Sequence, residues 1–227
     1  LKDTPVYIAD GHHRYTTAMN YGQPLRDGGL IDKDHEANFV LFALVARSDP
    51  GLLVLPTHRM IRGLSGNYSF DTLLEALKAD FDLTKIAPPT DISDADAFLE
   101  PYPKHSLALL SGDDVWIATL SRPEAMVEAA PDQCNAWRKL DVAILHKLII
   151  DKALAPWGVE EDNVEYTPDG NAAWQAANSG DAQLSIVMRG TPLKAVEAVA
   201  DADQAMPHKS TYFYPKLATG MILKPVE

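Results

Sequence analysis

The sequence predicts an α+β fold, in which a mixed α/β sheet is covered by helices. Short apolar runs of strand length alternate with segments of helical periodicity, and Gly and Pro separate the two kinds of segment. Of the 227 residues, 46% are hydrophobic, which is enough for a substantial core. We expect three regions, namely a first site region over 1–68, a small α+β insert over 69–130 and an α/β region over 131–227 that completes the fold.

The start of the chain concentrates more chemistry than any other stretch. Val6 to Ile8 favour a buried strand, Asp10-Gly11 marks a break, and a helix follows that we expect to end at Gly22. A tight turn before a helix leaves backbone N–H groups that bind phosphate, and Arg14 adds a planar set of donors. Three titratable residues at this corner are candidate catalytic groups: Asp10, His12 and His13.

The next apolar run, 38–47, has no helix caps and predicts a central strand buried on both faces. Residues 52–55 predict a second strand that forms a hairpin with it. We expect the following Thr57-His58-Arg59 cluster to leave the sheet. Polar groups at a strand end are typical of a binding pocket, so His58 and Arg59 are candidate phosphate or nucleotide ligands; a surface turn capped by Thr57 is the alternative.

Periodicity and caps predict the remaining elements. In the insert we expect a helix over 69–80 capped by Ser69 or Asp71, a strand over 81–86, a helix over 93–100 capped by Ser93, and a hairpin of 106–110 with 115–120. In the last region we expect helices over 137–154, 172–179 and 191–202, and strands over 163–166, 182–188 and 219–226.

Asp141 and His146 lie on the longest predicted helix. Their spacing of five does not stack them on one α-helical face, so no metal site is predicted there, and both remain minor candidates.

The tail over 206–216 is the second concentration of functional groups. Two lysines, two hydroxyls, a histidine and three aromatic residues lie within it, and in an acidic protein such a cluster indicates an anion-binding wall. The glycines of a P-loop are missing before its Lys-Ser-Thr sequence. The candidate phosphate or nucleotide ligands here are Lys209, Ser210, Thr211 and Lys216.

Composition narrows the class of partner. The net charge of −12 and a pI of about 4.9 argue against nucleic acid as a partner. The single cysteine, Cys134, excludes an intramolecular disulfide and a Cys-rich metal site. No apolar run approaches the ~20 residues of a membrane span, so we expect a cytoplasmic protein that acts on a small molecule or nucleotide. Because Leu1 is not a start methionine, we also expect an N-terminal region to precede it. The sequence does not define the oligomeric state.

The segment GHHRYTTAM resembles the Gly-x-x-Arg motif of the ParB/sulfiredoxin-like superfamily. Gly11, His13 and Arg14 match that motif, and His12 stands where sulfiredoxin has its catalytic Cys and ParB nucleotidases have an acidic residue. The resemblance implies a ParB/sulfiredoxin-like core that holds nucleotide phosphates at this turn. It excludes sulfiredoxin chemistry, because the cysteine is missing.

A second resemblance covers nearly the whole chain. The blocks YIADGHHRY, LLVLPTHR, WRKLDVAILHKLI and MPHKSTYFYPKLATGMI are similar, in this order, to the domain-of-unknown-function family numbered 1015. Some members of that family carry a ParB-like label, and its activity is undefined.

The leading hypothesis is an enzyme that binds ATP, ADP or another nucleotide with Mg²⁺ and transfers a phosphoryl group to a small molecule. The superfamily contains a free-serine kinase, so the resemblance implies a serine-type substrate. Gly11 and Arg14 would bind phosphate, and Lys209 and Lys216 would offset the charge that develops on the transferred group. Asp10 would hold Mg²⁺, act as a base or only cap the turn. The alternatives are a noncatalytic ParB-like nucleotide switch or DNA-partition module, and a small-molecule phosphatase.

Overall fold

The computed structural model describes residues 4–218 and 220–225. The chain forms two compact units, one of Leu1–Leu53 with Phe213–Glu227 and the other of Val54–Tyr212. The three regions expected from the sequence stay a prediction.

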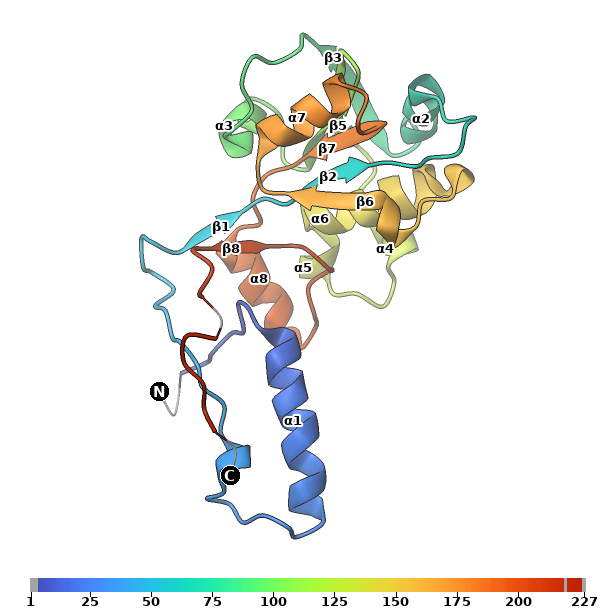
Figure 1. The fold of residues 1–227 in the computed structure, drawn as a ribbon. Helices are drawn as coiled ribbons and strands as arrows, with labels where there is room; N and C mark the ends of the chain where they lie inside the picture. Colours follow the sequence, from blue (N-terminus) through green and yellow to red (C-terminus); the bar gives the residue numbers. More distant parts are fainter. Residues whose placement is uncertain (1–3, 219, 226–227) are drawn as a thin grey trace. The chain divides into compact units, whose positions relative to one another are not determined.

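The larger unit is built on an antiparallel sheet (Figure 1). Its strands run in the spatial order β3 (Phe81–Ile86), β5 (Asp114–Leu120), β4 (Ser106–Ser111), β7 (Leu184–Val187), β2 (His58–Ile61) and β6 (Val164–Thr167), and neighbouring strands pair antiparallel. A separate two-stranded sheet joins β1 (Leu53–Leu55) and β8 (Tyr212–Tyr214). Helices with an antiparallel sheet confirm the predicted α+β class.

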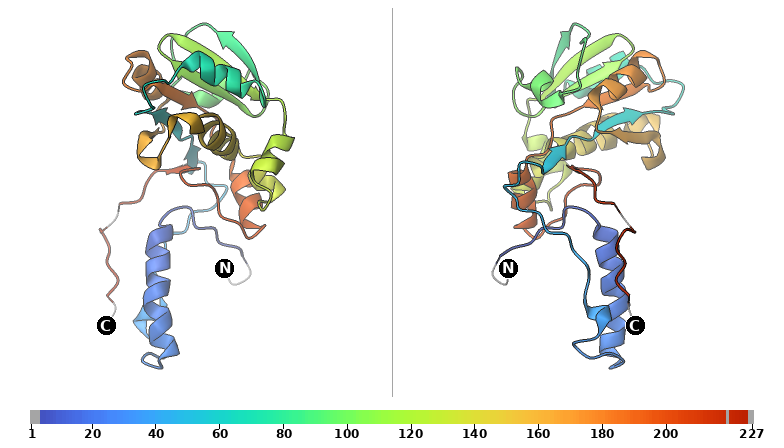
Figure 2. Two further views of the ribbon diagram at one scale, coloured as in Figure 1. Left: turned by 90° about the vertical axis from the view of Figure 1, so that its right-hand side faces the viewer. Right: turned by 60° about the vertical axis from the view of Figure 1, so that its left-hand side comes forward.

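Helices cover both faces of the six-stranded sheet (Figure 2). Successive strand side chains point to opposite faces, so Leu107 and Leu109 join one hydrophobic cluster whereas Ala108 and Leu110 join the other. The first cluster packs under α2 (Phe70–Leu77), α4 (Glu124–Ala129), α5 (Asn135–Arg138), α6 (Asp141–Ile144), the π-helix η2 (Leu145–Ala153) and α8 (Leu193–Ala200). The second packs under α3 (Ala95–Leu99) and α7 (Gly170–Asn178). Two short 3₁₀ helices, η3 (Ala155–Trp157) and η4 (Glu161–Asn163), complete the unit.

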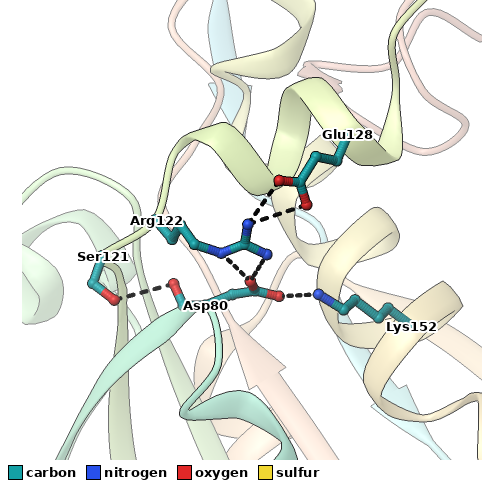
Figure 3. Close-up of polar contacts among 5 residues, drawn as sticks. All are labelled: Asp80, Ser121, Arg122, Glu128 and Lys152. Atoms are coloured by element: carbon teal, nitrogen blue, oxygen red, sulfur yellow. Dashed lines mark hydrogen bonds and ion pairs between the residues drawn. The ribbon is translucent and has the colours of Figure 1, made fainter.

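A buried carboxylate, that of Asp80, ties three of these elements together (Figure 3). Arg122, which follows β5, donates from Nε and Nη2 to its Oδ1 at 2.9 and 2.6 Å, and Lys152 of η2 donates to Oδ2 at 2.6 Å. Burial of Asp80 would raise the pKa of its carboxyl, but the bonds from Lys152 and Arg122 outweigh burial and hold that pKa below the ordinary value. The carboxylate therefore joins the start of β3 to the π-helix.

Two predictions about the helices of this unit were wrong. The segment expected as one helix over 137–154 is divided into α5, α6 and η2, and the i→i+5 bond from Leu154 N to Ile149 O (2.8 Å) belongs to the π-helix. The helix α3 is capped by Asp94, whose Oδ1 accepts from Ala97 N at 3.0 Å, and not by Ser93. The cap of α2 by Ser69 is confirmed.

The smaller unit contains α1 (His12–Asp27) and the 3₁₀ helix η1 (Glu36–Asn38). The helix does not end at Gly22 as expected. Gly22 is buried within it, and a Cβ added there would lie 3.0 Å from the carbonyl oxygen of Ala37. The glycine therefore permits close packing of α1 against η1.

Three predicted strands are not formed. Residues 6–8 and 39–47 belong to no described helix or strand, Asn38 ends η1, and the described part of 219–226 contains no strand; Thr219 and Val226 lie outside the described residues. Most apolar side chains of 38–47 are exposed and not buried in a sheet, with Leu41 at 58% and Phe42 at 54%. Consequently β1 pairs with β8 and not with the expected partner.

Among the described residues, no helix combines the length and the apolarity that crossing a bilayer requires.

Replacing Asp80 with Ala should lower the free energy of unfolding by about 2 kcal/mol, because it leaves two cations without their buried partner. Since the pKa of Asp80 is lowered from 3.8, the wild-type advantage is complete above pH 3.8 and declines as the pH falls toward the folded-state value. Urea denaturation at several pH values measures both effects. The control is Glu75→Ala, in an exposed pair on α2, which should change the free energy of unfolding by less than about 0.5 kcal/mol. Equal losses of stability in the two variants would contradict the stabilising role of the Asp80 carboxylate.

Candidate functional site

The predicted corner forms at the N-terminus of α1, within the smaller unit. Gly11 is the N-cap residue, with a left-handed φ of 86°, and no side chain caps the first backbone N–H groups of α1. The Arg14 guanidinium folds back over this glycine, since a Cβ at Gly11 would lie 3.0 Å from Arg14 Nη2. The lack of a side chain at Gly11 thus makes the close approach of Arg14 possible.

Asp10 joins Arg14 to the C-terminal tail. Arg14 Nη2 lies 3.2 Å from Asp10 Oδ2, and Lys216 Nζ lies 3.0 Å from Asp10 Oδ1 across 206 residues of sequence. The Lys216 hydrogen bond lowers the pKa of the Asp10 carboxyl, and the charges of Lys216, Arg14 and His12 add to that effect against a smaller opposing effect of burial. The corner thus carries two cations around one ionised carboxylate, and its residues are half exposed.

His12 and His13 are exposed on the first turn of α1. Among the described residues, no group of three or more His, Cys, Asp or Glu side chains could hold a metal ion by itself.

The other predicted ligands, His58, Arg59, Lys209, Ser210 and Thr211, lie in the larger unit, where Arg59 contacts the backbone carbonyl of Lys209. His58 and Arg59 do not leave the sheet as expected, because they belong to β2 and are fully buried. Thr57 Oγ1 donates to the Lys209 carbonyl at 2.6 Å, and Arg59 Nη2 donates to the same carbonyl at 3.1 Å. The buried Ser210 hydroxyl donates to the Pro207 carbonyl. The Lys209 backbone carbonyl therefore holds this part of the tail beside β2 by hydrogen bonds.

The Arg59 charge is held mainly by neutral groups. Its Nη1 donates to the Thr57 carbonyl, its Nη2 lies 3.0 Å from His146 Nε2, and its guanidinium carbon lies 5.1 Å from the centre of the Tyr166 ring. Burial lowers the pKa of Arg59 to about 10. Because a guanidinium can only donate, His146 accepts this hydrogen bond at Nε2 and carries its proton on Nδ1.

Two histidines beside Arg59 are kept neutral. Burial first, and then the Arg59 charge, lower the pKa of both His58 and His146 to about 4. His58 Nδ1 accepts from Met188 N at 3.3 Å, so its proton is on Nε2.

His146, Tyr166 and His208 line a cavity of about 490 Å³ in the larger unit. Its wall also carries three acidic residues, Asp151, Glu160 and Glu161, which disfavour an anionic ligand in this cavity. The assignment of His58, Arg59, Lys209, Ser210 and Thr211 to a phosphate site stays a prediction.

Sequence reasoning did not select His105 or Tyr166, both of which contact charged groups. His105 Nδ1 lies 2.7 Å from Asp141 Oδ1, so Asp141 and His146 contact different neighbours, in agreement with their predicted failure to stack. No local sequence pattern predicts the His105–Asp141 pair or the Arg59–Tyr166 pair, because each consists of residues far apart in the sequence.

The chain belongs to the DUF1015 family, described as a protein of unknown function, whose model matches residues 1–143. A search of curated proteins found no match.

Solved structures of low similarity align with most of the chain. A variant of free serine kinase in complex with AMP is 16% identical with a TM-score of 0.45, and the alignment covers 90% of this chain and 66% of that one. A conserved hypothetical protein from Pyrococcus furiosus is 13% identical with a TM-score of 0.45, and the alignment covers 90% and 68%. The chain spans just under two thirds of the length of the free serine kinase structures.

Between pH 6.5 and about 4 the unfolded chain binds protons that His58 and His146 do not bind in the folded state. Stability should therefore fall as the pH drops through this range, with each histidine contributing about 1.4 kcal/mol per pH unit. His146→Gln should reduce the slope by nearly half, measured by urea denaturation at each pH. An unchanged slope in His146→Gln would contradict the neutral state of His146.

Proposed function

We propose that the protein binds the phosphates of a nucleotide or a phosphorylated small molecule at the N-terminus of α1 and transfers a phosphoryl group. The observation that supports this most strongly is the contact of Lys216 with Asp10 beside Arg14. It gathers two cationic side chains at a helix N-terminus that has no side-chain cap.

An anion at this corner would meet three kinds of donor. The backbone N–H groups of α1 would bind phosphate oxygens, Arg14 would offer a planar pair of donors, and Lys216 would offer a point charge. The ParB/sulfiredoxin-like Gly-x-x-Arg pattern of Gly11 and Arg14 agrees with this assignment. A phosphate would compete with Asp10 for the two cations.

The carboxylate of Asp10 at the α1 corner is suited to bind Mg²⁺ together with the phosphates of a nucleotide. Mg²⁺ is usually bound by one or two carboxylates together with substrate phosphates and water, and Asp10 supplies one half-exposed carboxylate next to the proposed phosphate position. The metal would neutralise charge that develops on the phosphates.

Asp10 suits a cation better than it suits proton transfer. Its carboxyl is ionised and its pKa is lowered by Lys216 and Arg14, so it is a weak base at neutral pH. His12 or His13 would then accept the proton of the attacking hydroxyl while its oxygen bonds to the phosphorus and the bond to the leaving phosphate oxygen breaks. Both histidines lie on the first turn of α1.

The acceptor that we propose is the hydroxyl of a serine-type small molecule, which follows from the resemblance to a superfamily containing a free-serine kinase. Water as the acceptor would make the protein a phosphatase, so phosphate release from phosphoserine without a nucleotide would identify that reaction. The net charge of −12 gives no support to DNA binding.

Arg14→Ala and Lys216→Ala should each weaken the binding of ADP about tenfold, because each removes a charge-assisted contact. Isothermal titration measures the dissociation constant directly. Lys33→Ala, at a side chain that is 90% exposed in the loop after α1, is the control and should bind like the wild type. Undiminished ADP affinity in both corner variants would remove this corner from the proposal.

Gly11→Ala and Gly29→Ala form a matched pair, because both glycines have left-handed φ values, 86° and 65°. Each substitution should cost about 1 kcal/mol of stability from backbone strain. Only Gly11→Ala should also lose ADP binding, since its Cβ would displace Arg14 whereas nothing lies within 4 Å of the corresponding Cβ at Gly29. Thermal denaturation with and without ADP separates the two effects, and equal ADP stabilisation of both variants would count against the role of Arg14.

A further inference from the structure

A second cavity, of about 280 Å³, lies in the larger unit between α4, α5 and α6 and the adjoining ends of β4 and β5. None of the residues assigned to the α1 corner belongs to its lining. Its volume would hold roughly nine water-sized groups, at about 30 Å³ each. The cavity is therefore large enough for a small metabolite but not for a nucleotide.

A histidine backed by a carboxylate lines this cavity. His105 Nδ1 lies 2.7 Å from Asp141 Oδ1, so Nδ1 donates and Nε2 is left to accept or donate. The Asp141 side chain is 18% exposed and that of His105 31%, so the pair is largely withdrawn from solvent. His105 also has a left-handed φ of 62°, which few residues other than glycine adopt. An imidazole is thus held in one orientation at the cavity wall, despite an unfavourable backbone conformation.

Two cations line the same cavity. Arg138 is held in place by Nη1, which donates to the carbonyls of Ala130 and Pro131, both at 3.2 Å. Its Nε is buried and finds no hydrogen-bond partner among the described residues. Lys139 follows it in the sequence, and Glu124 is the one carboxylate in the lining. The cavity is accordingly more positive than the protein as a whole, whose net charge is −12.

The lining also has apolar side chains, which come mainly from α4 and α6. Met126 and Ile144 are buried, whereas Val127 is 52% exposed. An exposed apolar side chain beside two cations suits a ligand that has both an anionic group and a hydrocarbon part.

We propose that this cavity is a binding site for a small organic anion that joins a carboxylate or phosphate group to a short apolar group. Arg138 and Lys139 bind the anionic group, Met126 and Val127 contact the apolar group, and His105 hydrogen-bonds the ligand through Nε2. Asp141 is the positioning residue that orients His105. The site is independent of the phosphate site at α1, so either proposal can fail without the other.

Imidazole NMR of the ¹⁵N-histidine-labelled chain tests this site, with sodium isovalerate as the probe. The His105 signals, assigned by their loss in His105→Gln, should shift saturably with isovalerate. The uncharged isostere 3-methylbutan-1-ol should give no saturable shift. Lys139→Gln should raise the isovalerate dissociation constant about tenfold, and Val127→Asp, which places a carboxylate at an exposed position of the lining, should do the same.

Lys78→Gln is the matched control, because Lys78 lies on α2 in an exposed pair with Glu75 and should leave the dissociation constant unchanged. The absence of a saturable shift would overturn the proposal, as would an equal response to the alcohol. Unchanged affinity in both Lys139→Gln and Val127→Asp would also overturn it. Far-UV circular dichroism of each variant verifies that loss of binding does not reflect unfolding.

Discussion

The larger unit depends on a guanidinium that is buried on a strand beside the edge of its sheet. Arg59 lies on β2, between β7 and β6, and is fully inaccessible to solvent. Within the described residues no carboxylate pairs with it, so its charge is stabilised by the carbonyls of Thr57 and Lys209, by His146 and by the Tyr166 ring. A buried charge that loses such partners is strongly destabilising. This constraint fixes the Lys209 backbone beside β2, and the Arg59 charge adds to burial in lowering the pKa of the neighbouring His58 and His146.

The two proposed sites illustrate opposite uses of a carboxylate. At the α1 corner, Asp10 is half exposed and shared by two cations, so an incoming phosphate can take over those cations at little desolvation cost. In the second cavity, Asp141 is mostly withdrawn from solvent and orients an imidazole. Asp80 represents a third case, in which a buried carboxylate pairs with two cations and holds neighbouring elements together. The environment of each carboxylate, more than its sequence neighbours, separates these roles.

Asp141 on α6 and His146 on η2 lie on one continuous helical segment and contact different neighbours. A regular α-helix over the whole segment would place them about 140° apart, and the structure directs Asp141 to His105 and His146 to Arg59. The π-helix η2 also carries Lys152, which donates to Asp80 before β3. The same helix therefore contacts both Arg59, through His146, and Asp80, through Lys152.

The sequence by itself determined the α+β class, most strands and helices of the larger unit, the Ser69 cap and the glycine corner before α1. These features depend on alternation, periodicity and caps, which act between near neighbours in the chain. Only the tertiary structure decided that 38–47 forms no strand, that His58 and Arg59 lie inside a strand with a neighbour on each side, and that Lys216 reaches Asp10. Each of those outcomes depends on partners far away in the sequence, and the same apolar or cationic residues are compatible with burial, exposure or pairing until those partners are placed.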